Sequence, residues 1–384
     1  MTDFPTLTWP DTDGPRTLRW RSEAGVPAPK RVVVADDRTT ADVAYRLACE
    51  GTALLWRGDY QNARQLLQAM ARRAEHKPRK GGAPKAPATP IEAFHLHRQA
   101  QAQRARTLGM VLLPIEGDYS IALRRAPDAK LACEEAWGAP DGEPSAVSLR
   151  EVLGLIGAHE WRRKGVAIPA LGGAHIHPYY GVFSPVRGEY LDLVARVPLP
   201  SEALKKAFDI GTGTGVIAAV LASRGVKHVV ATDQDARALA CARENLDRLG
   251  YGDQVEVIEV DLFPPGRAPL VVCNPPWVPA RPASPIEYAV FDPDSRMLRG
   301  FLAGLKDHLE PGGEGWLILS DFAEHLGLRT REALVEWIVE AGLEVAGRED
   351  IRPRHPKASD PTDPLHRART AEVTSLWRLK VRSE

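Results

Sequence analysis

Four short segments in the second half of the chain follow apolar runs and carry residues that could bind one ligand. They are the glycine-rich turn Asp209-Ile-Gly-Thr-Gly-Thr-Gly215, then Asp233, then Asp261, and then Asn274-Pro275-Pro276-Trp277. Ligands of open α/β sheets bind beyond the carboxyl ends of the strands. Any one segment alone is better explained as a turn or a helix cap. Four of them at one sheet edge predict a binding site.

The glycine-rich turn suits close contact with a ligand. Gly211, Gly213 and Gly215 let the backbone bend tightly and approach a bound group, where a Cβ atom would collide. The helix that follows offers free N–H groups and a positive dipole end. The turn is not a dinucleotide-binding fingerprint, because Val216 stands where that motif has its third glycine.

The two following aspartates suit a nucleoside. Asp233 lies 24 positions after Asp209, which is the spacing of a carboxylate that accepts hydrogen bonds from ribose hydroxyls. The Asp261 carboxylate could accept a hydrogen bond from the amino group of adenine, with Leu262 beside the adenine ring. The four segments together predict a ligand that joins a nucleoside to an amino acid through a charged sulfonium.

The segment Asn274-Pro275-Pro276-Trp277 decides the expected chemistry. Prolines fix the backbone and lack an N–H. The side-chain oxygen of Asn274 and the carbonyl of Pro275 could therefore both accept hydrogen bonds from one planar NH₂ group. Trp277 could stack on the planar group that carries this nitrogen. Two acceptors would bias that nitrogen toward tetrahedral geometry as it attacks a methyl group, and the rate gain would come from positioning and polar preorganisation. The alternative is a structural Pro-Pro turn.

Alternating strand and helix patterns from residue 205 onward predict an α/β fold with a Rossmann-like parallel sheet covered by helices on both faces. Asp235 is expected to cap the helix before Leu249. The last strand has no helix after it, so we expect it to be antiparallel. The predicted strands are seven, at 207–210, 227–232, 255–260, 270–273, 315–320, 343–347 and 373–381.

Residues 1–180 predict a separate, mixed α+β domain that precedes the sheet domain of 181–384. We expect an irregular lead-in, one strand, four helices, a flexible connector rich in proline, glycine and lysine, and one hairpin. The lead-in is predicted at 1–30, the strand at 31–35 and the connector at 78–90. The helices are predicted at 39–50, 59–76, 91–108 and 148–161, and the hairpin at 108–113 with 119–123.

Two further segments have open interpretations. Residues 181–200 precede the first strand of the sheet domain and could be a packed entrance helix or a gate over the site. His175 and His177 stand two residues apart in a glycine-rich loop, but no third ligand is evident, so we expect no metal.

Composition bounds the function classes. The 384 residues carry 50 basic and 50 acidic side chains, so any affinity for nucleic acid must come from local patches. No run of 18 apolar residues exists, and the first ten residues have no basic region typical of a signal peptide. The scattered cysteines, with no metal-ligand spacing, favour a reduced, cytoplasmic protein; they are Cys49, Cys133, Cys241 and Cys273.

On the motif residues quoted above, 181–384 resembles a class I S-adenosylmethionine-dependent methyltransferase of the small-domain type. That group includes release-factor glutamine N5-methyltransferases and RNA adenine-N6 and guanine-N2 methyltransferases. The resemblance implies a seven-stranded sheet, S-adenosylmethionine as cofactor and a planar nitrogen as acceptor. It does not separate the substrates. Tyrosine or phenylalanine is commoner at the fourth motif position, so Trp277 is a departure.

Three functions remain open. The first is methylation of RNA, with the N-terminal domain docking the substrate. It rests on residues 57–106, which hold 11 Lys/Arg against 3 Asp/Glu, and on the basic connector 352–369. The second is methylation of a protein glutamine. The third is a non-catalytic cofactor-binding scaffold, against which the intact Asn274–Trp277 segment argues.

Overall fold

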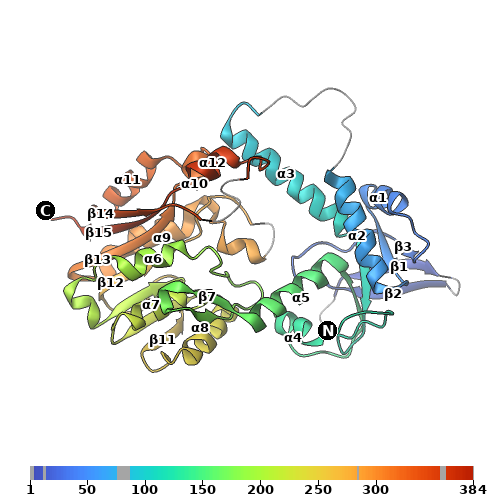
Figure 1. The fold of residues 1–384 in the computed structure, drawn as a ribbon, viewed down its shortest axis with the longest axis horizontal. Coiled ribbons are helices and arrows are strands. Elements are labelled where there is room, and N and C mark those ends of the chain that lie inside the picture. The colour runs from blue at the N-terminus through green and yellow to red at the C-terminus, as the bar shows by residue number, and fades with distance from the viewer. Residues whose placement is uncertain (1–3, 12–13, 76–86, 283–284, 355–359, 384) are drawn as a thin grey trace. The chain divides into compact units, whose positions relative to one another are not determined.

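The computed structural model describes residues 4–11, 14–75, 87–282, 285–354 and 360–383 (Figure 1). The chain divides into two compact units, the first formed by 1–86 with 95–160 and the second by 87–94 with 161–384. The observed division thus falls 20 residues before the boundary expected at 180. Residues 161–180 belong to the second unit because β7 (Val166–Ile168) and β8 (Ala174–Ile176) contribute side chains to its core.

The first unit contains a six-stranded sheet in the order β1-β2-β6-β5-β4-β3. Strands β3, β4 and β5 are parallel neighbours, whereas β6 runs antiparallel to β5. The mixed α+β character matches the expectation. Its strands are β1 (Thr6–Asp11), β2 (Gly14–Trp20), β3 (Arg31–Ala35), β4 (Thr52–Trp56), β5 (Val111–Ile115) and β6 (Ser145–Ser148), and its helices are α1 (Ala41–Cys49), α2 (Tyr60–Glu75) and α4 (Lys130–Trp137), while α3 (Pro90–Leu108) and α5 (Leu149–Lys164) run across the division of the chain.

Two expectations for the first unit were wrong. The lead-in 1–30 contains the β1–β2 hairpin, which buries Leu7, Trp9 and Trp20 in the core. The predicted hairpin of 108–113 with 119–123 does not form, because β5 pairs with β6 and β4 instead. Most of the predicted connector 78–90 lies outside the described residues, and its last residue, Pro90, begins α3.

The second unit is built on a seven-stranded sheet in the order β11-β10-β9-β12-β13-β15-β14. β15 runs antiparallel to both of its neighbours, as predicted for the last strand. This sheet confirms the Rossmann-like fold class. The strands are β9 (Ala207–Ile210), β10 (Val229–Asp233), β11 (Val255–Glu259), β12 (Ala268–Cys273), β13 (Leu309–Ser320), β14 (Leu343–Ile351) and β15 (Thr374–Val381), and the helices are α6 (Glu189–Arg196), α7 (Val216–Ser223), α8 (Ala236–Arg248), α9 (Arg296–His308), α10 (Phe322–His325), α11 (Arg331–Glu340) and α12 (His366–Ala371).

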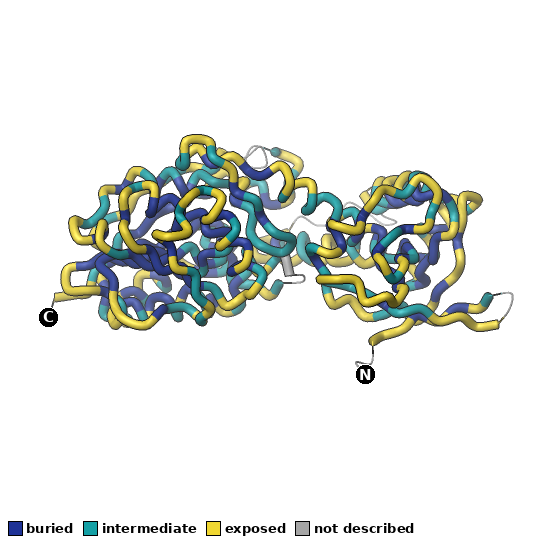
Figure 2. Tube along the Cα trace, turned by 90° about the horizontal axis from the view of Figure 1, so that it is seen from below, coloured by how far each residue is buried: buried dark blue, intermediate teal, exposed yellow. Residues whose placement is uncertain are grey.

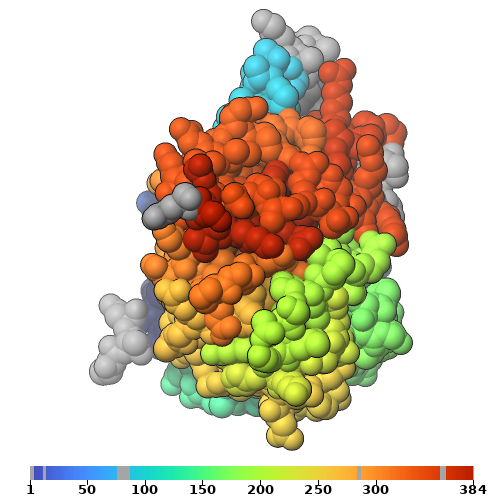
Figure 3. All heavy atoms as spheres, turned by 90° about the vertical axis from the view of Figure 1, so that its left-hand side faces the viewer, coloured from blue at the N-terminus to red at the C-terminus, as the bar shows by residue number. Residues whose placement is uncertain are grey.

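Helices cover both faces of this sheet because its central strands are apolar on both sides. On β12, Leu270 and Val272 pack with helices α6, α7 and α8, whereas Val271 and Cys273 pack with α9 and α11. The strands consequently run among buried residues, shown in dark blue in Figure 2. Helix α6 lies beside β14 and β15, where yellow-green and red surfaces adjoin in Figure 3. Residues 189–196 are therefore a packed helix.

Among the described residues, no helix combines the length and apolar character needed to span a membrane. The four cysteines are free thiols, three of them buried and Cys49 exposed.

Candidate active site

The strand register brings the predicted site segments together. Ile210, the last residue of β9, pairs with Thr232 of β10 on one side and with Cys273 of β12 on the other. The next residue along each strand is Gly211, Asp233 or Asn274, so these three lie side by side at the carboxyl edge of the sheet. The chain order reverses between β9 and β12. Such a switch point is where ligands of open α/β sheets bind.

The glycine turn is fixed to β10 through its backbone. The N–H of Thr212 donates to the carbonyl of Thr232 at 2.8 Å, and the N–H of Gly213 donates to Oδ2 of Asp233 at 3.0 Å. The N–H of Asp235 donates to the other oxygen of Asp233, at 3.0 Å. Asp233 is thus oriented by two backbone donors, and each of its oxygens retains a lone pair for a ligand hydroxyl.

The three glycines of the turn differ in their surroundings, although all have positive φ values in the left-handed region. A Cβ on Gly213 would meet nothing within 4 Å, so this residue opens onto free space. A Cβ on Gly215 would lie 3.2 Å from Cα of Ala242, so this residue lets α7 approach α8. A Cβ on Gly211 would reach the flexible tip of Met297. Only Gly213 therefore has the open surface that a cofactor needs.

We expect Gly213→Ala and Gly215→Ala to fail in different ways. Gly213→Ala should lower the free energy of unfolding by about 1–2 kcal/mol because of the positive φ at this position. It should also weaken S-adenosylhomocysteine binding at least about tenfold, because the added methyl group would occupy space that the bound ligand needs. Gly215→Ala should add an overpacking cost of about 1–3 kcal/mol but change affinity only a few-fold. Urea unfolding and titration calorimetry measure both quantities, and the opposite ranking would contradict the assignment.

Asp209 holds the turn from inside the protein. It is fully buried, and its Oδ2 accepts from the hydroxyl of Thr212 at 2.6 Å and from the N–H of Ala218 at 3.1 Å. Oδ1 has no hydrogen-bond partner in the described structure. Burial raises the pKa of Asp209 to about 7, although the two hydrogen bonds oppose the shift. These contacts position the turn; a direct contact of Asp209 with cofactor stays a prediction.

The raised pKa of Asp209 predicts a pH dependence of stability. In the folded protein Asp209 has a pKa of about 7, whereas in the unfolded chain its pKa is the ordinary value of 3.8. Between these values the folded state binds more protons, so this residue's contribution to the free energy of unfolding falls as pH rises from 4 to 7 and is constant above. Urea unfolding across this range should show a smaller fall for Asp209→Asn than for wild type; equal falls would contradict the shift.

The adenine side of the predicted site lies after β11. Leu262 has a φ of 70°, a rare conformation for a residue with a Cβ, and its carbonyl accepts from the hydroxyl of Thr232 at 2.6 Å. Strained backbone of this kind persists where the surroundings determine it, and it is frequent at binding sites. Asp261 forms an exposed ion pair with Arg296. The sequence did not indicate this partner, which would compete with an adenine amino group.

At the end of β12, Asn274 and Trp277 contact each other directly. The indole N–H of Trp277 donates to Oδ1 of Asn274 at 2.9 Å, and the Trp277 ring packs edge-on against Tyr190 of α6. The bond fixes which way the Asn274 amide faces and leaves one lone pair on Oδ1. The stacking of Trp277 on the acceptor stays a prediction, and its polar contact in the structure is with Asn274. Phenylalanine could not make this bond.

We expect Trp277→Phe to lower kcat while leaving cofactor affinity unchanged. The ring remains, but Asn274 loses the donor that orients it, and one neutral hydrogen bond is worth about 0.5–1.5 kcal/mol, or roughly 2–10-fold in rate. Single-turnover methylation with saturating cofactor measures the effect. Trp337→Phe, which alters a half-buried tryptophan of α11, is the matched control. Equal rates for the Trp277 and Trp337 variants would contradict a positioning role.

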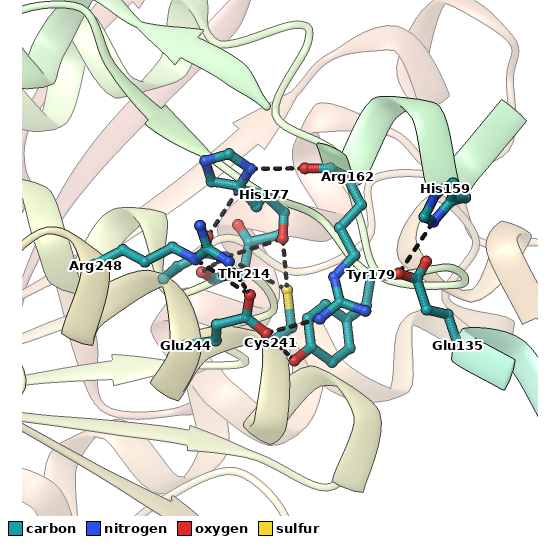
Figure 4. Close-up of polar contacts among 10 residues, drawn as sticks. Glu135, His159, Arg162, His177, Tyr179, Thr214, Cys241, Glu244 and Arg248 are labelled. Atoms are coloured by element: carbon teal, nitrogen blue, oxygen red, sulfur yellow. Dashed lines mark hydrogen bonds and ion pairs between the residues drawn. The ribbon is translucent and has the colours of Figure 1, made fainter. Parts of the chain in front are cut away.

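A polar network ties the segment before the sheet to the glycine turn (Figure 4). The amide nitrogen of Asn245 on α8 donates to the carbonyl of Thr214 at 3.1 Å, and Oδ1 accepts from the N–H of His177 at 2.7 Å. Nδ1 of His177 lies 2.6 Å from the carbonyl of Arg162, and Arg162 pairs with Glu244 at 2.8 Å. His177 is therefore a bracing residue of this network.

No cluster of three or more His, Cys, Asp or Glu side chains that could hold a metal ion is found in the described part of the chain. A further residue missed from sequence is Asp292, which is buried and accepts from the N–H groups of Met297 and Leu298 at 3.0 and 3.1 Å. It fixes the start of α9, from which Arg296 and Met297 reach the site. Its signal was available, since an aspartate shortly before a helix is a common cap.

Comparison with known proteins gives related sequences for this site. The sequence profile of the methyltransferase small domain matches residues 175–334. Release factor glutamine methyltransferase of Cereibacter sphaeroides is 38% identical over 118 residues, which are 30% of this chain and 39% of that protein. The tRNA1(Val) (adenine(37)-N6)-methyltransferase of Bacteroides thetaiotaomicron is 36% identical over 77 residues, which are 19% of this chain and 32% of that protein.

A third relative is the probable cobalt-precorrin-6B C(15)-methyltransferase (decarboxylating) of Methanothermobacter thermautotrophicus, 36% identical over 107 residues, which are 28% of this chain and 48% of that protein. The chain thus spans less than half the length of each of these relatives. The profile match includes every predicted site segment from Asp209 to Trp277. It agrees with the resemblance to small-domain methyltransferases that the motif residues indicate. Residues 175–334 of this chain are thus similar to the methyltransferase small domain, and the match covers less than half of the chain.

Proposed function

We propose that this protein is an N-methyltransferase that acts on a planar amino group, namely an exocyclic base nitrogen of RNA in the manner of adenine N6. The observation that carries the proposal is the Trp277–Asn274 hydrogen bond at the carboxyl end of β12. It holds a single amide acceptor rigidly beside the glycine turn. That arrangement suits a nitrogen whose lone pair is delocalised and which needs positioning more than a strong base.

The residues of the switch point fit the cofactor. Gly213 opens onto free space, and both oxygens of Asp233 keep a lone pair for the ribose hydroxyls. When bound, S-adenosylmethionine supplies an electrophilic methyl group on a charged sulfonium. Asn274 and the carbonyl of Pro275 would accept the two N–H groups of the acceptor. Trp277 would hold Asn274 in place, and Pro276 would keep the segment extended.

Charge favours RNA over protein as the substrate. Arg352 and Arg367 lie within the connector 352–369 that precedes β15, and both residues are exposed. Arg369 is already paired with Asp363 at 2.7 Å, so it adds little. We infer that these exposed arginines and the first unit dock a polyanion. Residues 355–359 of the connector lie outside the described structure.

Methylation of a protein glutamine is the second candidate. A side-chain amide is also planar, and the release factor glutamine methyltransferase of Cereibacter sphaeroides supports this reading through its 38% identity over 118 residues. The amide would use the same acceptors on Asn274 and Pro275. The two candidates therefore differ in what the rest of the protein binds.

Labelling of a cell lysate separates these functions. Purified protein is incubated with S-adenosylmethionine that carries a labelled methyl group, with Asn274→Ala protein as the control for contaminating enzymes. We expect label above the control that nuclease releases and protease does not. Release by protease alone would replace RNA with a protein substrate. Label no higher than the control would support a non-catalytic scaffold.

A further inference from the structure

The first unit has a polar cavity of about 280 Å³ at the carboxyl edge of its parallel strands. Ala35 at the end of β3 and Trp56 at the end of β4 are paired in register. Asp37 and Arg57 to Asp59 follow them and line the cavity, together with residues 122–125, which come after β5. This is the position where α/β sheets bind ligands, and none of the methyltransferase motif residues lies here.

The cavity does not reproduce the cofactor site of the second unit. A Cβ on Gly58 would lie 2.5 Å from Oδ1 of Asp37, so the turn after β4 is filled by the protein's own side chain. The turn after β9, by contrast, opens onto free space at Gly213. Asp37 is itself occupied, since Oδ1 accepts from the backbone N–H of Asp59 and the side chain of Asn62, each at 3.0 Å. A nucleoside held against the turn is thereby excluded.

Two consecutive arginines are anchored at the mouth of the cavity by one buried carboxylate. Asp59 is only 5% exposed, and its Oδ2 lies 2.7 Å from Nε of Arg125 and 3.2 Å from Nε of Arg124. Arg125 has a φ of 57°, a rare conformation that brings both side chains to the same carboxylate. The pKa of Asp59 is lowered, chiefly by its hydrogen bond from Arg125, so the carboxylate stays charged.

The remaining donors of this cluster face solvent. The Arg124 side chain is 82% exposed, and its ion pair with Asp59 is made through Nε at 3.2 Å, so much of its guanidinium group faces solvent. Arg57 is exposed, and its side chain makes no hydrogen bond or ion pair with the residues that the structure describes. Three arginines against two aspartates leave one positive charge in excess. Outward-facing guanidinium groups held at a fixed position match the oxygens of a phosphate.

We propose that this cavity, with Arg57 and Arg124 at its mouth, binds a backbone phosphate of the RNA substrate and docks the strand on the first unit. The inference rests on RNA as the substrate class of the proposed function. It assigns recognition to a site that carries no methyl-transfer residue. Contacts to backbone phosphates position a strand without reading its bases.

Salt-dependent RNA binding by the full-length protein tests the inference. The probe is an unstructured, fluorescent RNA of about 20 nucleotides, titrated between about 50 and 200 mM salt. The double variant Arg57→Gln/Arg124→Gln is compared with Arg16→Gln/Arg46→Gln, which removes two exposed arginines of the same unit outside the cavity. Thermal unfolding of both variants checks that the unit is folded.

We expect the cavity variant to flatten the plot of log K against log salt by about 0.7, because the loss of one phosphate contact to a single strand lowers the slope by that amount. Its affinity at the lower salt concentrations should fall about fivefold, and the control should change less than half as much. If wild type binds RNA but the two double variants behave alike, the cavity is not the docking site. If wild type shows no salt-dependent binding, the RNA proposal fails together with this one.

Discussion

Asn274→Ala should abolish detectable methyl transfer while changing cofactor affinity no more than a few-fold. Asn274 lies beside Gly211 at the end of neighbouring strands, and its Oδ1 is oriented by the indole N–H of Trp277 at 2.9 Å. Removing one preorganised polar group of an active site typically costs about 10²–10³ in rate. The cofactor contacts expected at Gly213 and Asp233 do not involve Asn274, so binding should survive.

Single-turnover methylation and titration calorimetry with S-adenosylhomocysteine together measure this outcome. Asn274→Gln is the informative companion variant, because it keeps an amide but moves it by one methylene. If positioning decides the rate, the glutamine variant should lose most of the activity as well. Full activity in either variant, or loss of cofactor binding in Asn274→Ala, would show that the residue has another role.

Asp233→Ala should have the opposite signature and weaken cofactor binding first. Both of its oxygens are oriented by backbone N–H groups, from Gly213 and Asp235. A hydrogen bond to a charged group is worth about 1.5–3 kcal/mol, so losing the carboxylate should raise the Kd about 10–100-fold. At saturating cofactor the rate should recover to within a few-fold of wild type.

Asp235→Ala is the matched control for this experiment. Asp235 is two residues away, and its carboxylate caps α8 by accepting from the N–H of Arg237 at 2.8 Å. Its loss should lower the free energy of unfolding by about 0.5–2 kcal/mol, as for other helix caps, but leave cofactor affinity nearly unchanged. Equal loss of affinity in the two variants would mean that only the shape of the turn matters.

The second unit was predictable from sequence because its signals are local and agree with one another. Strands β9, β10 and β12 are short apolar runs that lead into a glycine or polar residue. Helices α8 and α11 have side-chain caps, Asp235 and Thr330. Register follows from burial on both faces of β9 and β12. The side-by-side placement of Gly211, Asp233 and Asn274 is therefore a consequence of fold class.

Contacts between segments that are distant in the sequence could not be predicted. The β1–β2 hairpin was missed because Pro, Thr and charged residues dominate it, and only Leu7, Trp9 and Trp20 report its buried face. The Asp261–Arg296 pair joins residues 35 positions apart and depends on where α9 begins. The anchoring of Arg124 and Arg125 to Asp59 likewise needs the fold of the first unit, since 65 and 66 positions separate them.

We expect the methyl donor and a planar amino group to meet between the glycine turn and the Asn274–Trp277 segment. A crystal structure of the protein with S-adenosylhomocysteine tests it most directly. We expect the ribose hydroxyls to bind Asp233, the amino-acid portion to lie over Gly213 and the sulfur to face Asn274. A ligand bound elsewhere, or that sheet edge closed by the protein's own side chains, would contradict it.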